Sequence, residues 1–194
     1  TTVGKVNALW EITPMFSLRG TVCTGFHAPS PGQSNVQILT TAFTNGVQVQ
    51  TGTYPVTNPI AQYFGATALK PEESTNFGLG FVFQPLDNLT VTVDAYRIEV
   101  DDRIGLSQTY SVTAADIAAE PALLAVGEGG DVQYPTSAYD SRTTGLDFVG
   151  TYRSRLGSGS LDLSLAYNYN DTEVTKFDAD IIGDAQRADI EGTI

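Results

Sequence analysis

Apolar and polar residues alternate with a period of two along six stretches of this chain, and no other feature constrains its fold as strongly. Between Phe16 and Phe26, for example, Leu18 and Val22 recur on one side, whereas Arg19 falls on the other. Successive side chains of a β-strand point to opposite faces. Each stretch therefore predicts a strand with one apolar face and one small or polar face.

The six predicted strands fall into three pairs. They cover about residues 3–12, 16–26, 73–84, 89–100, 144–153 and 161–169, which is about the length that a tilted strand needs to cross a bilayer. Short turns join the strands within a pair, whereas long polar segments separate the pairs. This rhythm is typical of outer-membrane barrels, which have tight periplasmic turns and long extracellular loops. The sequence therefore predicts an all-β fold: an antiparallel, up-and-down segment of a transmembrane β-barrel with long extracellular loops.

The polar positions of the six strands are expected to share one face, turned toward the lumen of a barrel. Charged and amide side chains at these positions include Arg19, Asp94, Asp147 and Asn168. The alternation loses its simple form after Ala95, because Arg97 and Glu99 then fall at positions of the apolar face. Either a β-bulge near Tyr96 or a strand that rises clear of the lipid would explain this change.

The long connections, at about residues 28–71 and 101–141, are predicted to be loops rich in polar residues and glycine. Only one helix is predicted within them, at about residues 113–120. Thr113 is a suitable N-cap residue for that helix, and Pro121 would end it.

Composition excludes several classes of function. The net charge is −12 and the 10 Lys and Arg residues form no cluster, so a nucleic-acid partner is not expected. The chain contains one histidine, His27, and one cysteine, Cys23. A catalytic triad or a Cys- or His-based metal cage would need more of these residues, so no enzymatic activity, metal site or cofactor is predicted.

Four segments of the chain, taken in order, resemble the barrel of TonB-dependent receptors. Residues 25–30 read GFHAPS and resemble the family's GFRAPS strand end, and residues 69–74 read LKPEES and resemble its LKPExS strand start. Residues 89–104 (LTVTVDAYRIEVDDRI) and 142–152 (RTTGLDFVGTY) are similar to barrel strands of the same family. The departure is His27, where the family usually has arginine.

The resemblance implies a large plugged barrel of about 22 strands, of which this chain would supply about six. Residues 1–194 would then be part of one TonB-dependent receptor β-barrel domain, with the N-terminal plug and the terminal strands absent. It implies an outer-membrane importer in a Gram-negative bacterium, in contact with membrane lipid. That importer would be driven by the energy-transducing TonB complex through the missing plug, and it would take up a ferric siderophore or similar metal chelate.

Aromatic and basic residues of the long loops are the candidates for ligand binding, because stacking and charge can hold an iron chelate or a similar ligand. The candidates are Tyr54, Tyr63, Phe64, Tyr110, Tyr134 and Arg142. The same aromatic residues could instead pack the loops onto one another. An extracellular β-sandwich adhesin or carbohydrate-binding module remains the alternative for the whole chain, because a sandwich core shows the same alternation.

Overall fold

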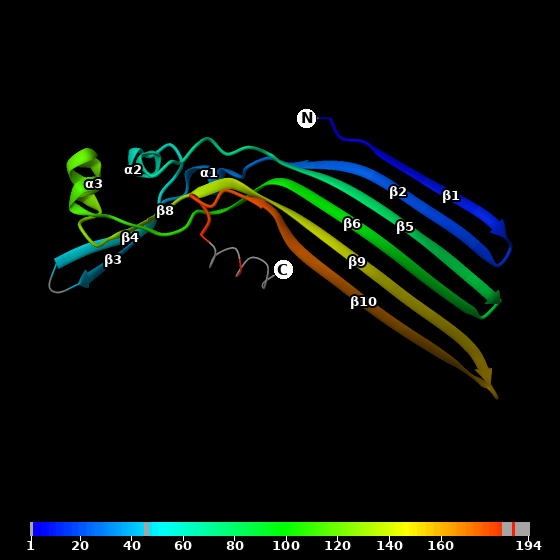
Figure 1. Cartoon of the computed structure of the whole chain (residues 1–194). Coiled ribbons are helices and arrows are strands. Elements are labelled where there is room, and N and C mark those ends of the chain that lie inside the picture. Colours follow the sequence, from blue (N-terminus) through cyan, green and yellow to red (C-terminus); the bar gives the residue numbers. More distant parts are fainter. Residues whose placement is uncertain (1, 45–46, 184–187, 189–194) are drawn as a thin grey trace. The chain divides into compact units, whose positions relative to one another are not determined.

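Six strands form one antiparallel sheet in the computed structural model, which describes residues 2–44, 47–183 and 188 (Figure 1). The order across the sheet is β1-β2-β5-β6-β9-β10. The strands are β1 (Lys5–Thr13), β2 (Phe16–His27), β5 (Glu72–Leu86), β6 (Leu89–Leu106), β9 (Pro135–Leu156) and β10 (Gly159–Phe177). Each strand of this sheet pairs with the next strand of the same sheet along the chain, so the predicted up-and-down order is confirmed.

The register of the first pair follows from the alternation. Val6 lies opposite Val22 on the apolar side, and Asn7 lies opposite Thr21 on the polar side. The Thr21 hydroxyl lies 2.8 Å from the Asn7 side-chain oxygen and donates to it. A slip of one residue would move every side chain to the wrong face, so the pattern itself specifies this pairing.

The strands continue beyond their predicted ends. β6 extends to Leu106 and β9 already begins at Pro135, so the predicted loop at residues 101–141 was too long. β10 reaches Phe177, beyond its predicted end at about residue 169. Period-two alternation marks a strand only where its two faces meet different surroundings. At the start of β9, Pro135 and Thr136 are both buried although they are consecutive, so no alternation was visible there.

The long connections hold more regular structure than was predicted. A second sheet has the order β3-β4-β8-β7 and includes β3 (Ile38–Thr44), β4 (Val47–Thr53), β7 (Tyr110–Ser111) and β8 (Asp131–Gln133). The long connections also contain the helices α1 (Pro31–Asn35), α2 (Pro59–Tyr63) and α3 (Ala114–Ala119) and the 3-10 helix η1 (Pro121–Ala125). The prediction of a helix after Thr113 is confirmed by α3, which Thr113 caps. Among the described residues, no helix is both long enough and apolar enough to cross a membrane.

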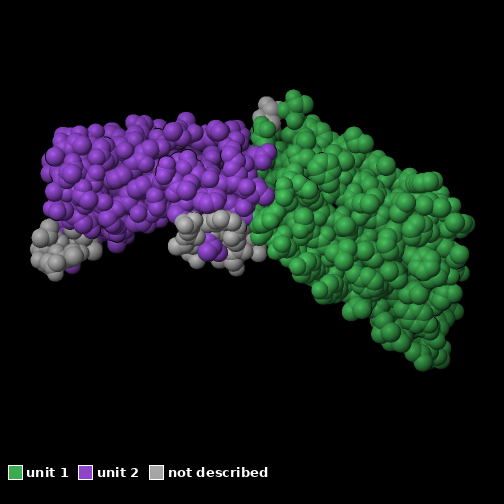
Figure 2. Space-filling model, in the orientation of Figure 1, with its two compact units in different colours: residues 1–26, 73–100, 141–173 green, residues 27–72, 101–140, 174–194 purple. Residues whose placement is uncertain are grey.

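The chain divides into two compact units, a sheet unit and a loop unit (Figure 2). The sheet unit consists of residues 1–26, 73–100 and 141–173. The loop unit consists of residues 27–72, 101–140 and 174–194.

The sheet unit has the two predicted faces. On the polar face, Arg19 of β2 donates from Nε to Asp94 of β6 at 2.7 Å, and Asn168 of β10 donates to Asp147 of β9. The alternation keeps its phase past Ala95, since Tyr96 meets Asn168 of the polar face, whereas Arg97 pairs with Glu99 two residues further along β6. The bulge considered near Tyr96 is therefore not needed.

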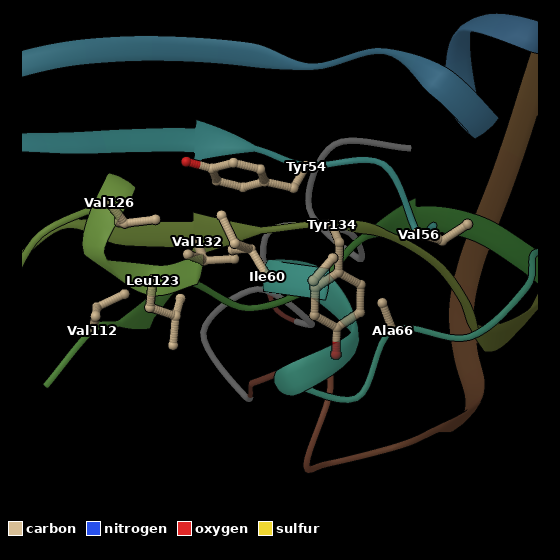
Figure 3. Packing of buried hydrophobic residues seen from close by; sticks show 10 residues of the cluster. Tyr54, Val56, Ile60, Ala66, Val112, Leu123, Val126, Val132 and Tyr134 are labelled. Carbon is tan, nitrogen blue, oxygen red and sulfur yellow. The ribbon is translucent and has the colours of Figure 1, made fainter. Parts of the chain in front are cut away.

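The core of the loop unit is a cluster of buried aliphatic and aromatic residues (Figure 3). Val112, Leu123, Val126 and Val132 are each 2% exposed or less. Their segments are far apart in the chain, and the parallel pairing of β4 with β8 helps to join them. Burial of this apolar surface stabilises the loops as one folded body.

Candidate functional site

Four of the candidate residues form a continuous series of aromatic rings in the loop unit. The rings of Tyr63 and Phe64 meet edge to face with centroids 5.0 Å apart. Phe64 stacks on Tyr110 at 5.0 Å, and Tyr110 stacks on Tyr134 at 5.9 Å. Such pairs contribute beyond the area that they bury, so this ring series connects α2, β7 and the segment between β8 and β9.

Each tyrosine of the ring series is also fixed through its hydroxyl group. Tyr134 donates to the Phe64 carbonyl at 2.7 Å, and Tyr110 donates to the Asp180 carbonyl at 2.8 Å. Tyr63 donates to the Asp116 carboxylate at 2.9 Å. These hydrogen bonds hold the plane of each ring, so the series is positioned before any ligand arrives.

Asp116 joins the exposed end of the ring series to α3. The Thr113 hydroxyl and backbone N–H both donate to its carboxylate, at 2.6 and 2.8 Å. These bonds, with that from Tyr63, lower the pKa of Asp116, whereas the bond to Asp116 raises the pKa of Tyr63. The carboxylate therefore stays ionised and keeps accepting from the Tyr63 hydroxyl at neutral pH.

The candidates differ widely in exposure. Tyr54 and Tyr134 are 1% and 0% exposed and belong to the core, where burial raises the pKa of both phenols. The Tyr54 hydroxyl is buried without a hydrogen-bond partner among the described residues. Tyr63 is 39% exposed, and Phe64 and Tyr110 are partly buried. Among the aromatic candidates, Tyr63, Phe64 and Tyr110 are therefore the ones that keep part of their surface exposed.

Arg142 lies on β9 in the sheet unit. Its guanidinium donates from Nε to Glu99 and from Nη1 to Glu173, both at 3.0 Å. Glu99 also accepts from Arg97. Arg142 is therefore part of a chain of alternating charges across β6, β9 and β10.

A polar hollow of about 500 Å³ in the loop unit was missed from the sequence. Lys70 pairs with Asp102 at 3.0 Å, and Lys176 lies 3.9 Å from Asp140. Asp140 also accepts from the Asp102 backbone N–H at 2.9 Å, where Asp102 has a φ of 51°. Aspartate adopts this left-handed conformation more readily than most residues. Lys70 and Asp102 both lie within segments that carry the family resemblance, and this resemblance is the signal in the sequence that could have indicated the hollow.

His27, at the end of β2, faces a carboxylate. Its Nδ1 lies 3.5 Å from Glu72, and Glu72 also accepts from the Ile104 backbone N–H at 2.8 Å. His27 thus lies beside Glu72 within the loop unit, at the position where the family usually has arginine.

Two solved structures share this fold at low sequence identity. The siderophore receptor PirA from Pseudomonas aeruginosa is 19% identical with a TM-score of 0.57, over 90% of this chain and 28% of that receptor. The copper transporter OprC is 19% identical with a TM-score of 0.50, over 87% of this chain and 20% of the transporter. The chain thus spans less than a third of either structure.

The comparison with protein families matches nearly the whole chain. No curated protein matches the sequence, but the family described as TonB dependent receptor-like, beta-barrel matches residues 1–191. This match, together with the up-and-down sheet, does not fit the alternative of a β-sandwich adhesin or carbohydrate-binding module. Because the match covers nearly the whole sequence, the chain belongs to the TonB-dependent receptor family and corresponds to part of its β-barrel.

Proposed function

We propose that this chain is part of an outer-membrane importer of a Gram-negative bacterium, which takes up a scarce nutrient in the form of a metal chelate. The observation that carries the proposal is the six-stranded up-and-down sheet with one polar and one apolar face. A barrel wall between lipid and an aqueous lumen requires both of these faces.

Residues 1–194 would form a portion of a single barrel domain. Six strands are fewer than the eight of the smallest membrane barrels, so further strands must complete the wall. The plug through which the TonB complex acts would likewise come from another part of the receptor. Neither element is among the segments described above.

The charge of the loop unit favours a neutral or cationic chelate over an anionic one. Its sequence contains four basic and thirteen acidic residues, a net charge of −9 out of −12 for the chain. Within the described residues, Lys70 and Lys176 each lie beside an aspartate. A field of this sign raises the local concentration of cations and repels anions, more strongly at low ionic strength.

The proposed contact surface is the accessible part of the ring series: Tyr63, Phe64 and Tyr110. Tyr134 would hold the rings in place, because it stacks on Tyr110 and donates to the Phe64 carbonyl, and Tyr54 would contribute to the core of the loop unit. Arg142, in the sheet unit, is a separate candidate, which would donate a hydrogen bond to a polar group of the ligand. A ferric siderophore remains the leading ligand class, restricted by charge to complexes without a large negative charge.

The test is uptake of radiolabelled iron chelates of different net charge by cells that produce the receptor containing this chain. We expect uptake of neutral or cationic chelates that stops when the TonB complex is inactivated. Tyr63→Ala should weaken chelate binding to the purified receptor, whereas Tyr169→Ala, an exposed tyrosine on β10 of the sheet unit, should not. Uptake that persists without TonB would refute the importer. Uptake confined to strongly anionic chelates would refute the charge argument.

A further inference from the structure

A hollow of about 580 Å³ lies on the apolar face of the sheet unit. It spans four neighbouring strands. Its apolar-face lining is Val6 and Ala8 of β1, Gly20 and Val22 of β2, Phe77 and Leu79 of β5, and Ala95 and Arg97 of β6.

Small residues create the depth of this hollow. Ala8 and Gly20 lie directly opposite each other in the β1–β2 ladder, and Ala95 is the small residue of β6. Larger side chains surround them, including Val22, which pairs with Val6, and Leu79, which is 66% exposed. Ala8, Gly20 and Ala95 thus leave the backbone less covered here than the larger side chains around them do.

One basic group borders the hollow. Arg97 pairs with Glu99, and Glu99 also accepts from Arg142 at 3.0 Å. Two guanidinium groups therefore share the Glu99 carboxylate, and Arg142 also pairs with Glu173. Among the described residues, Arg97 is the one charged residue in the lining of the hollow; its Nε and Nη2 donate to Glu99, and because a guanidinium has five N–H donors, Arg97 can also donate to an anionic group.

We propose that this hollow binds one acyl chain of a phosphorylated membrane lipid, with the lipid phosphate accepting hydrogen bonds from Arg97. The proposal rests on the proposed membrane location of the sheet unit. An empty hollow would forfeit the dispersion contacts of its lining, and water cannot satisfy an apolar one. A flexible acyl chain fills such a surface, and Arg97 selects chains that carry a phosphate.

The test is native mass spectrometry of the delipidated receptor containing this chain, titrated with dimyristoyl phosphatidylglycerol. Gly20→Leu is expected to fill the hollow, because a Cβ at Gly20 would meet nothing closer than the Gly78 carbonyl oxygen at 3.9 Å. Gly150→Leu is the matched control on β9, where a Cβ would meet only the Phe148 ring at 3.5 Å. Heat-dependent gel mobility checks that each variant is folded.

Binding should fall about tenfold in Arg97→Gln, from the loss of a charge-assisted hydrogen bond. Gly20→Leu should abolish the tight lipid adduct, and Gly150→Leu should keep it. Dimyristoylglycerol, which has no phosphate, should bind the wild type as weakly as phosphatidylglycerol binds Arg97→Gln. Inorganic phosphate alone should not compete.

Equal lipid binding by Gly20→Leu and Gly150→Leu would overturn the proposal. Equal binding of the two lipids would overturn the role of Arg97. A receptor recovered outside the membrane fraction would refute the membrane location itself. A membrane receptor that binds the lipid but imports no chelate would refute only the proposed import function.

Discussion

Gly80→Ala should destabilise the sheet because the Arg19–Asp94 pair crosses β5 at this residue. Arg19 lies on β2 and Asp94 on β6, and β5 lies between them. Gly80 is buried, and a Cβ added there would lie 2.7 Å from both the Asp94 carboxyl carbon and the Val93 carbonyl oxygen. A side chain could rotate away, but the backbone oxygen cannot do so without a shift of β6. Glycine at this position therefore allows the polar pair to form.

The size of the effect follows from three contributions. Overpacking of a tight site costs about 1–3 kcal/mol, and loss of a partly exposed ion pair adds about 0–1 kcal/mol. Replacing a glycine within a strand by alanine stabilises by about 0.5–1 kcal/mol. The second and third contributions have opposite signs and similar sizes, so they largely cancel. Gly80→Ala should therefore lower the free energy of unfolding by about 2 kcal/mol, which is the cost of overpacking.

Gly78→Ala is the control, on the same strand and the same face two residues away. A Cβ at Gly78 would meet nothing closer than the Thr21 Cβ at 3.9 Å, so this variant should gain about 0.5 kcal/mol. Urea unfolding of the receptor in lipid vesicles, followed by tryptophan fluorescence, measures both. If the two variants are equally stable, the close approach of Asp94 to β5 does not exist in the folded protein.

Three further predictions concern the two faces and the loops. In the intact barrel, Leu163→Arg on the apolar face should cost about 2–4 kcal/mol if it lies near mid-membrane, and Ser164→Arg much less; equal costs in lipid-vesicle unfolding would contradict the face assignment. The protection factor of the α3 amides, which compares their exchange rate with that of the unfolded chain at the same pH, should decrease as pH falls below the ordinary Asp116 pKa of 3.8. The folded state lowers that pKa, so the stabilising contribution of Asp116 is present above this pH and is lost on protonation; an unchanged protection factor in acid would refute the role of Asp116. Tyr134→Phe removes a hydroxyl bonded to a backbone carbonyl and should cost about 1 kcal/mol, while chelate binding stays unchanged; a large loss of affinity would mean that the phenol contacts ligand.

The strands of the sheet unit could be predicted because their signals are local. Alternation within ten residues defines a strand and its faces. A turn such as Asp87-Asn88, between β5 and β6, defines where one strand ends and the next begins. The helix capped by Thr113 was predictable for the same reason, since the capping residue lies three positions from its partner Asp116. The existence of these six strands, the facing of their side chains and the pairing across short turns were therefore contained in short windows of sequence.

The loop unit could not be predicted in this way, because its contacts join residues far apart in the chain. The pairing of β4 with β8 brings Thr51 beside Asp131, and no local pattern identifies such partners. Burial of Tyr54 and Tyr134, which look like their exposed counterparts in sequence, depends on how those segments pack. Whether an aromatic residue belongs to the core or to the contact surface was decided only by the tertiary structure, since burial is a property of the surrounding segments and not of the residue itself.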